Sequence, residues 1–135
     1  MDMLLEVVTM PVSDIDRAKD FYTNKVGFKA EFDVRVSESV RFVQLTPPGS
    51  KCSIHFTTDS SVMKPGVVKS VILVVNNAED AKAELEAKGV TLGEVETFNW
   101  GKHVQFSDPD GNSWILQESY AHNKRQAEEQ GKTTG

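Results

Sequence analysis

The fold is decided by the stretch VVTMPVSDIDRAKDFYTNKVGF at residues 7–28, because its pattern returns later in the chain. A shift of 63 residues places it on SVILVVNNAEDAKAELEAKGV at residues 70–90, with one gap of a single residue. Each copy has an apolar run, an amphipathic run and a glycine, which predicts a strand, a helix and a helix end. The copies share few identical residues, so the internal repeat rests on the shared pattern.

We expect helices over residues 14–26 and 78–88. Each begins at a capping pair, in which a side-chain oxygen accepts a hydrogen bond from a free backbone N–H of the first turn. The two pairs are Ser13 with Asp16 and Asn76 with Glu79. Each helix ends at a glycine, Gly27 or Gly89, which tolerates the left-handed backbone that follows a helix. Both helices are short, so their stability depends on packing against a sheet.

Alternating runs separated by turn residues follow each predicted helix. The expected strands cover residues 28–36, 40–46 and 52–57 in the first half, and 91–98, 103–107 and 113–119 in the second half. Together with the strand before each helix, they make each half a βαβββ module, so the chain is of the α+β class.

The predicted organisation is a single domain over residues 1–120. Its modules cover residues 4–57 and 67–119, and a linker rich in turn residues joins them at 58–66. Residues 121–135 hold almost no apolar side chains, so we predict a disordered tail there.

Composition limits the functions that the chain can have. Its 135 residues are 39% hydrophobic and 26% charged, as is typical of one soluble domain. Fifteen Lys and Arg against twenty Asp and Glu leave a net charge of −5, which argues against binding to nucleic acid. The apolar runs are too short to cross a bilayer, and we expect neither a signal peptide nor a membrane partner. A single cysteine, Cys52, excludes an internal disulfide and favours a cytoplasmic location.

Alternate side chains of each predicted strand lie on opposite faces of the sheet. One face is almost wholly apolar, so we expect the helices to cover it. The other face mixes polar and aliphatic residues, as a ligand cleft with a few polar anchors does. The expected ligand-binding residues on this face are Thr9, Ser53, His55, Ser70, Ile72, His103, Gln105 and Gln117. A solvated sheet face has the same alternation, so the pattern alone leaves both interpretations open.

Two blocks of sequence resemble a known family. They are PVSDIDRAKDFY at residues 11–22, followed by VGF at 26–28, and FSDPDGNSW at residues 106–114. In these blocks the chain resembles the vicinal oxygen chelate superfamily, which includes glyoxalase I, bleomycin-resistance proteins and extradiol dioxygenases. The resemblance covers residues 4–119 and implies a glyoxalase-like fold. In that fold two βαβββ modules form curved mixed sheets around a cleft, with the helices outside. Many members are homodimers, which implies a homodimer here.

The resemblance also assigns four positions to a metal site. Enzymes of the superfamily hold a divalent ion with four inward side chains, two or three of them histidines and the rest carboxylates. The matching positions here are Val7, His55, Ser70 and Ile115. Valine and isoleucine have no donor atom and a serine hydroxyl is a poor ligand, which leaves His55 alone. We therefore expect no metal at the family's usual place, and no cofactor.

Three functions stay open, and whether the chain is an enzyme stays open with them. The leading prediction is a metal-free protein that binds a small, partly apolar ligand, for sequestration or an undefined activity. The second is a glyoxalase-like lyase or isomerase, or a dioxygenase, with an atypical metal site that includes His55 and Glu6 or Gln117. The third is a non-catalytic dimeric interaction module. Phe98 and Trp100 are candidates for stacking on an aromatic ligand or for a dimer contact.

Overall fold

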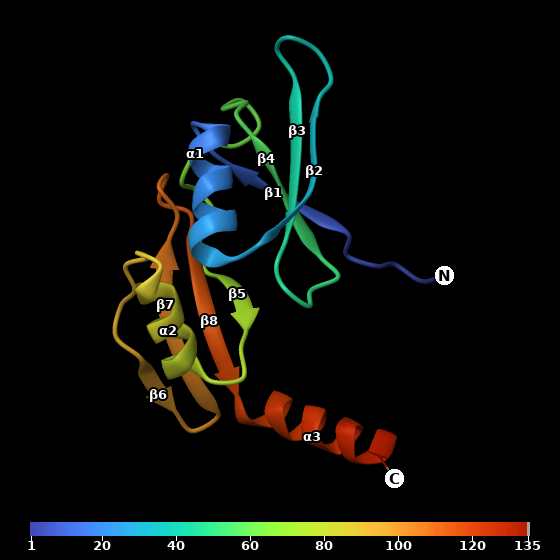
Figure 1. The fold of residues 1–135 in the computed structure, drawn as a ribbon, viewed down its shortest axis with the longest axis vertical. Coiled ribbons are helices and arrows are strands. Elements are labelled where there is room, and N and C mark those ends of the chain that lie inside the picture. The colour runs from blue at the N-terminus through green and yellow to red at the C-terminus, as the bar shows by residue number, and fades with distance from the viewer. Residues whose placement is uncertain (135) are drawn as a thin grey trace. The chain divides into compact units, whose positions relative to one another are not determined.

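The computed structural model describes residues 1–134, and the side chains of residues 1–129. The chain divides into two compact units. The first comprises Met1–Lys69 with Ser107–Ser113, and the second comprises Ser70–Phe106 with the residues from Trp114 onward. Each unit contains one four-stranded mixed sheet, and Figure 1 labels its elements. The predicted α+β class with two βαβββ modules is confirmed.

The sheet of the first unit has the strand order β1-β4-β3-β2. Its strands are β1 (Val7–Pro11), β2 (Lys29–Arg35), β3 (Arg41–Thr46) and β4 (Ser53–Thr57). β1 runs parallel to β4, and the other neighbours are antiparallel. Thr9 pairs with His55, and His55 pairs with Gln44. Because paired residues share a face, these three side chains lie on one face of the sheet, which we call the open face of the first unit.

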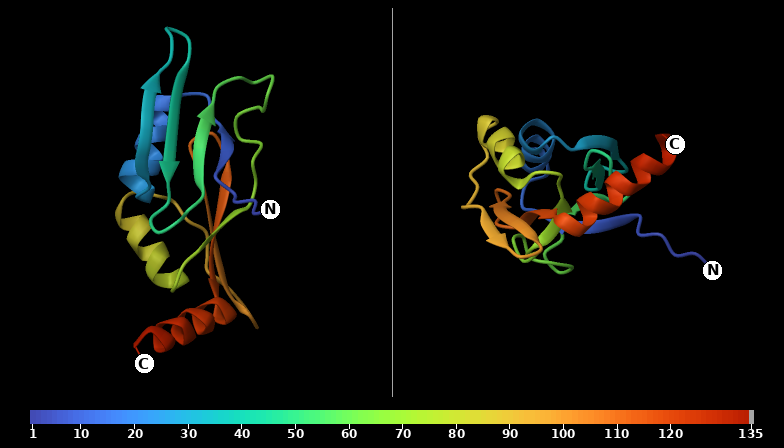
Figure 2. Two further views of the ribbon diagram at one scale, coloured as in Figure 1. Left: turned by 90° about the vertical axis from the view of Figure 1, so that its right-hand side faces the viewer. Right: turned by 90° about the horizontal axis from the view of Figure 1, so that it is seen from below.

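The opposite face of this sheet packs against a two-part helix (Figure 2). Helix α1 (Ile15–Asp20) continues directly into a π-helix, η1 (Phe21–Val26), where the sequence predicts one α-helix. The side chains of Phe21 and Tyr22 are buried there, and the Tyr22 ring centroid lies 5.8 Å from that of Phe56 in β4. This aromatic packing positions the sheet, and no helix of the first unit covers its open face.

The capping residue of each helix lies one residue later than the sequence predicts, although α2 begins at Ala78 as predicted. Asp14 caps α1, and Asn77 caps α2 (Ala78–Ala87). Each cap accepts a hydrogen bond from the backbone N–H three residues ahead, at 3.0 and 2.9 Å. The predicted cap Ser13 instead donates to Asp110 Oδ1 at 2.5 Å. Two adjacent residues can cap each helix, so the local sequence does not settle which one does.

The sheet of the second unit has the order β5-β8-β7-β6. Its strands are β5 (Val71–Val74), β6 (Glu96–Phe98), β7 (Gly101–Ser107) and β8 (Ser113–Ser119). Trp114 and Leu116 of β8 are buried on one face. Ile115 and Gln117 alternate with them and lie on the other face, which we call the open face of the second unit.

Glu118 ties α2 to the sheet of the second unit. Its carboxylate is buried and accepts a hydrogen bond from the backbone N–H of Ala78, the first residue of α2, at 2.9 Å. A negative charge at a helix N-terminus is favoured because the backbone N–H groups there are unpaired and point toward it. Glu118 therefore has a structural role.

The turn Ser107–Ser113 belongs to the first unit, although the sequence places it in the second module. Tyr22 Oη donates to Asp108 Oδ2 at 2.8 Å, and Asn112 Nδ2 donates to the carbonyl of Pro11 at 2.7 Å. Asp108 and Asn112 are both buried. The DPDG turn that carries the family resemblance thus completes the core of the first unit.

The prediction of a disordered tail over residues 121–135 is wrong as far as residue 134. A helix, α3 (Tyr120–Thr134), occupies this segment. Its sequence is poor in apolar residues but rich in Ala, Gln, Glu, Lys and Arg, which favour helix without a buried face. The side chains from Ala121 to Glu129 are mostly exposed, with His122 and Asn123 partly buried. No helix among the described residues is long and apolar enough to cross a membrane.

Candidate functional site

The open face of the first unit carries three of the predicted ligand-binding residues. Thr9 Oγ1 lies 2.7 Å from His55 Nε2, and the His55 ring stacks on Phe42 with centroids 5.5 Å apart and planes 27° apart. Ser53 shares this face by alternation, but it is buried and its hydroxyl bonds to Thr46 at 2.7 Å. His55 and Thr9 are therefore partly accessible and bonded to each other, whereas Ser53 is not accessible.

Phe42 is a member of this arrangement that the sequence pattern does not single out. It stands in β3 and alternates with Gln44 and Thr46, so the period-two pattern assigned it to one face of its strand. The register between β3 and β4, which brings that face to His55, is not visible in the sequence.

The open face of the second unit carries an aromatic cluster. The rings of Phe98 and Trp100 stack with centroids 5.2 Å apart and planes 2° apart. The His103 ring stands edge-on to both, with centroids 5.4 Å from Phe98 and 5.0 Å from Trp100. His103 Nε2 lies 3.0 Å from Gln117 Oε1, so two predicted ligand residues bond to each other. We call Phe98, Trp100, His103 and Gln117 the aromatic cluster.

The aromatic cluster keeps much of its ring surface accessible. Phe98 is 39% exposed and Trp100 is 44% exposed, although both are large and apolar. Gly101 follows Trp100 in the tight β6–β7 connection, where Phe98 pairs with Gly101. The stacked pair is thus held by a hairpin rather than by a long loop, and it offers a flat aromatic surface.

The other predicted residues of the second unit differ in their placement. Ile72 lies in β5 and is 49% exposed, and Gln105 lies exposed in β7. Ser70 precedes β5 rather than lying in it, and its backbone is left-handed with φ +59°. A left-handed residue interrupts the alternation of a strand, so the predicted orientation of Ser70 on the open face does not follow.

A pocket of about 180 Å³ adjoins His103. Its lining residues are Gly93, Glu94, Glu96, His103, Val104, Gln105 and Ile115. Glu96 pairs with His103 across the β6–β7 ladder, so their side chains share the open face. The sequence does not point to Glu96, because nothing in residues 91–98 indicates which strand pairs with them.

The residues at the family's metal positions do not fit a divalent ion. In the first unit Val7 has no donor atom, and the Nε2 atom of His55 is bonded to Thr9. In the second unit Ile115 has no donor atom either, and Ser70 offers only a hydroxyl. Within residues 1–129, no group of three or more His, Cys, Asp or Glu side chains is placed to hold a metal.

Comparison with known proteins identifies the family. The model of the Glyoxalase/Bleomycin resistance protein/Dioxygenase superfamily matches residues 4–116. The chain belongs to this superfamily. YetH, an uncharacterized protein of Bacillus subtilis (strain 168), is 30% identical over 113 residues, which cover 82% of this chain and 94% of YetH.

Solved structures of the superfamily share the fold. TnmS3, an antibiotic binding protein from Streptomyces sp. CB03234, is 30% identical with a TM-score of 0.80, over 87% of this chain and 97% of TnmS3. A superfamily member from Sphaerobacter thermophilus DSM 20745 is 32% identical with a TM-score of 0.76, over 86% of this chain and 97% of that one. The expected glyoxalase-like fold is confirmed.

Proposed function

We propose that this superfamily member binds a small, partly apolar molecule with a planar aromatic part, and sequesters it without a metal. The observation that carries the proposal is the half-exposed Phe98–Trp100 stack beside His103. Flat aromatic surface is costly to leave in water, and a planar ligand gains both burial and ring stacking from it. Gln117 holds the His103 ring, which leaves the imidazole edge able to orient a polar group of the ligand.

Two further observations support this proposal. TnmS3, which resembles this chain over most of both lengths, is an antibiotic binding protein, and we extend ligand binding from it to this chain. The second is the lack of metal donors at the superfamily's positions, which disfavours the lyase, isomerase and dioxygenase alternatives. Among the predicted ligand-binding residues, we propose as contacts those that share the second unit with the aromatic cluster, namely Ile72, His103, Gln105 and Gln117.

Tryptophan fluorescence tests the proposal directly. The chain has two tryptophans, of which Trp100 is 44% exposed and Trp114 is 1% exposed. A planar aromatic compound that stacks on Trp100 is expected to quench its emission in a saturable manner. Trp100→Phe keeps the buried Trp114 as the only emitter, and its emission should not change. Unsaturable quenching, or equal quenching in the variant, contradicts the proposal.

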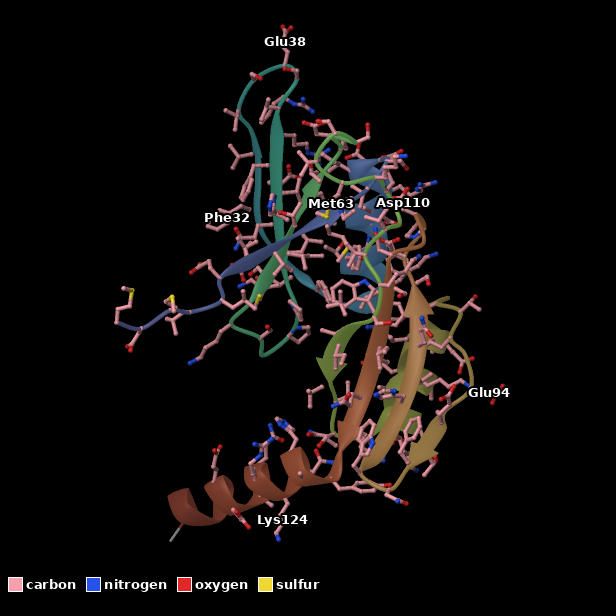
Figure 3. The ribbon with its side chains drawn as sticks, turned by 180° about the vertical axis from the view of Figure 1, so that it is seen from behind. Phe32, Glu38, Met63, Glu94, Asp110 and Lys124 are labelled. Carbon is pink, nitrogen blue, oxygen red and sulfur yellow. The ribbon has the colours of Figure 1, made fainter. Side chains whose placement is uncertain are left out.

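A homodimer is the second part of the proposal, and we assign the apolar side of the β2–β3 hairpin to it. Phe32, Val34 and Phe42 are 54%, 51% and 37% exposed and share the open face of the first unit. Phe32 projects from β2 on the side away from α1 (Figure 3). Such a contiguous apolar patch is unusual on a monomer and typical of an interface. A second copy of the chain, in a reducing compartment that suits Cys52, is the proposed partner.

Light scattering after size exclusion tests the dimer. Phe32→Glu places a charge in the patch and is expected to give a monomer. Val62→Glu is the matched control, since Val62 is 62% exposed but lies between β4 and β5, away from the hairpin sequence. A wild-type monomer at high micromolar concentration, or an equal effect of both variants, contradicts this part.

A further inference from the structure

Glu96 is an acidic residue beside the aromatic cluster. It lies two residues before Phe98 in β6, so the two side chains leave the same face of the strand about 7 Å apart. It also faces His103 across the ladder and lines the 180 Å³ pocket together with Gln105 and Ile115. The pocket is therefore lined by a carboxylate and by the aliphatic side chain of Ile115, and His103 connects it to the stacked rings of Phe98 and Trp100.

The Glu96 carboxylate has no ion pair or hydrogen bond with any other residue of the described chain. Two other acids of the second unit, Glu79 and Glu94, each lie near a lysine. Glu79 accepts from Lys102 Nζ at 2.9 Å, and Glu94 lies 3.9 Å from Lys82 Nζ.

Lys102, the cation nearest to His103 in sequence, is directed away from the pocket. It alternates with His103 in β7 and so lies on the opposite face, where the hydrogen bond with Glu79 raises its pKa. No lysine or arginine lines the pocket. Among the described residues, no lysine or arginine of the pocket lining thus compensates the negative charge of Glu96.

We propose that the pocket takes a cationic nitrogen group of the ligand, and that the ligand's planar aromatic part stacks on Phe98 and Trp100. This inference rests on the proposed ligand binding and specifies the ligand class. A cation next to Glu96 gains from the carboxylate, and the electron-rich faces of the adjacent aromatic rings attract it as well. An anion at the same place meets repulsion from Glu96 without a compensating cation.

Three planar probes of similar size and different charge test the inference. They are proflavine, a cationic acridine, 9-anthracenemethanol, which is neutral, and 9-anthracenecarboxylate, which is anionic. Binding of each is measured by fluorescence to the full chain. We expect proflavine to bind most tightly and the carboxylate least tightly. Glu96→Gln should weaken proflavine roughly fivefold, the upper range for an exposed ion pair, and leave the neutral probe unchanged.

Two variants separate this inference from the proposed function. Glu84→Gln removes an exposed carboxylate of the same unit that does not line the pocket, so it should leave proflavine binding within twofold. Trp100→Leu should weaken all three probes. If Glu96→Gln has no selective effect, or the anionic probe binds as tightly as proflavine, the cation pocket is refuted while ligand binding stands. If no probe depends on Trp100, the proposed function fails as well.

Discussion

His103 Nε2 lies 3.0 Å from Gln117 Oε1, and this bond joins neighbouring strands of the second unit across its open face. The amide oxygen fixes the imidazole ring while Phe98 and Trp100 contact its edge. A ring held from three sides has little rotamer freedom left to lose when a ligand binds. The bond therefore preorganises the aromatic cluster.

Replacing Gln117 by Leu should weaken both the fold and ligand binding. The variant removes one partly buried hydrogen bond, worth about 1 kcal/mol of unfolding free energy, and it frees the His103 ring. Chemical denaturation measures the first effect, and the quenching of Trp100 by a planar probe measures the second. Gln105→Leu is the matched control for stability, because Gln105 lies exposed on the same face as His103 and its side chain makes no such bond. Equal losses of unfolding free energy in both variants would argue against preorganisation.

Replacing Gly101 by Ala should destabilise the chain by more than about 2 kcal/mol, because buried overlap forces the backbone to move. An added Cβ at Gly101 would overlap the backbone carbonyl of Glu118. Gly89→Ala provides the comparison: its Cβ meets no atom within 4 Å, but its φ of +92° is unfavourable for alanine. That variant should lose about 1 kcal/mol. Thermal unfolding shows which of the two variants loses more stability. A Gly101→Ala variant as stable as the wild type would contradict the packing described.

Replacing Tyr22 by Phe should lower the unfolding free energy by about 2 kcal/mol, the range for a hydrogen bond to a charged, buried acceptor. The variant removes only the hydroxyl that donates to Asp108 Oδ2 and leaves the ring packing intact. Tyr120→Phe removes the hydroxyl of a tyrosine that is 45% exposed, and it should have almost no effect. Urea unfolding measures the free energy of unfolding of both variants, and the two values can be compared directly if the slopes of the curves are equal. Similar stability of the two variants would mean that the Asp108 contact contributes little.

The ion pair between Asp33 and Arg41 should make stability sensitive to acid. Hydrogen bonds from Arg41 and then from Lys19 hold the pKa of Asp33 well below its usual range. Because the folded state favours the ionised carboxylate, this contribution is complete above the unfolded pKa near 4 and is lost as pH falls below it.

Replacing Arg41 by Met should accordingly cost about 1 kcal/mol at pH 7, the upper range for a partly exposed pair, and progressively less below pH 4. Lys29→Met is the control, because the Lys29–Glu31 pair is 3.9 Å long and Lys29 is 77% exposed. Unfolding measured from pH 7 to pH 2 reports the difference between the variants. A loss of stability that is independent of pH would place the role of Arg41 in packing instead.

Chelation should leave the protein unchanged. Neither the first nor the second unit offers a donor set at the superfamily's positions, so EDTA is expected to alter neither the melting temperature nor the quenching of Trp100. Elemental analysis of purified protein should find less than one tenth of an equivalent of Zn, Ni, Mn or Fe. A stoichiometric metal that His55→Ala removes would favour the enzyme alternative.

The strands and their faces could be predicted because alternation is a local property. Residues such as Ile115 and Gln117 take opposite faces whatever their neighbours are. The helix caps were placed one residue early, because Ser13–Asp14 and Asn76–Asn77 each offer two capping side chains in a row. The low hydrophobicity of residues 121–135 predicts disorder, and the helix α3 forms because its residues favour helix without a buried face.

The contacts of the candidate site were harder to predict, because they depend on the register between strands. Phe42 meets His55 only through the β3–β4 pairing, and Glu96 meets His103 only through the β6–β7 pairing. Neither register follows from the composition of a single strand. Large aromatic residues near a turn make Phe98 and Trp100 candidates from the sequence alone, but the sequence does not show that their rings stack.

The attachment of the turn at residues 107–113 to the first unit bears on biosynthesis. Tyr22 and Pro11 find their partners in Asp108 and Asn112, some ninety to one hundred residues later in the chain. A nascent polypeptide that ends at the linker lacks those partners. The Tyr22 hydroxyl and the Pro11 carbonyl then have no hydrogen-bond partner in the incomplete core of the first unit. Most of the second repeat must therefore be synthesised before the first unit can complete its core. A gene divided between the repeats should yield two fragments that fold only when they are expressed together.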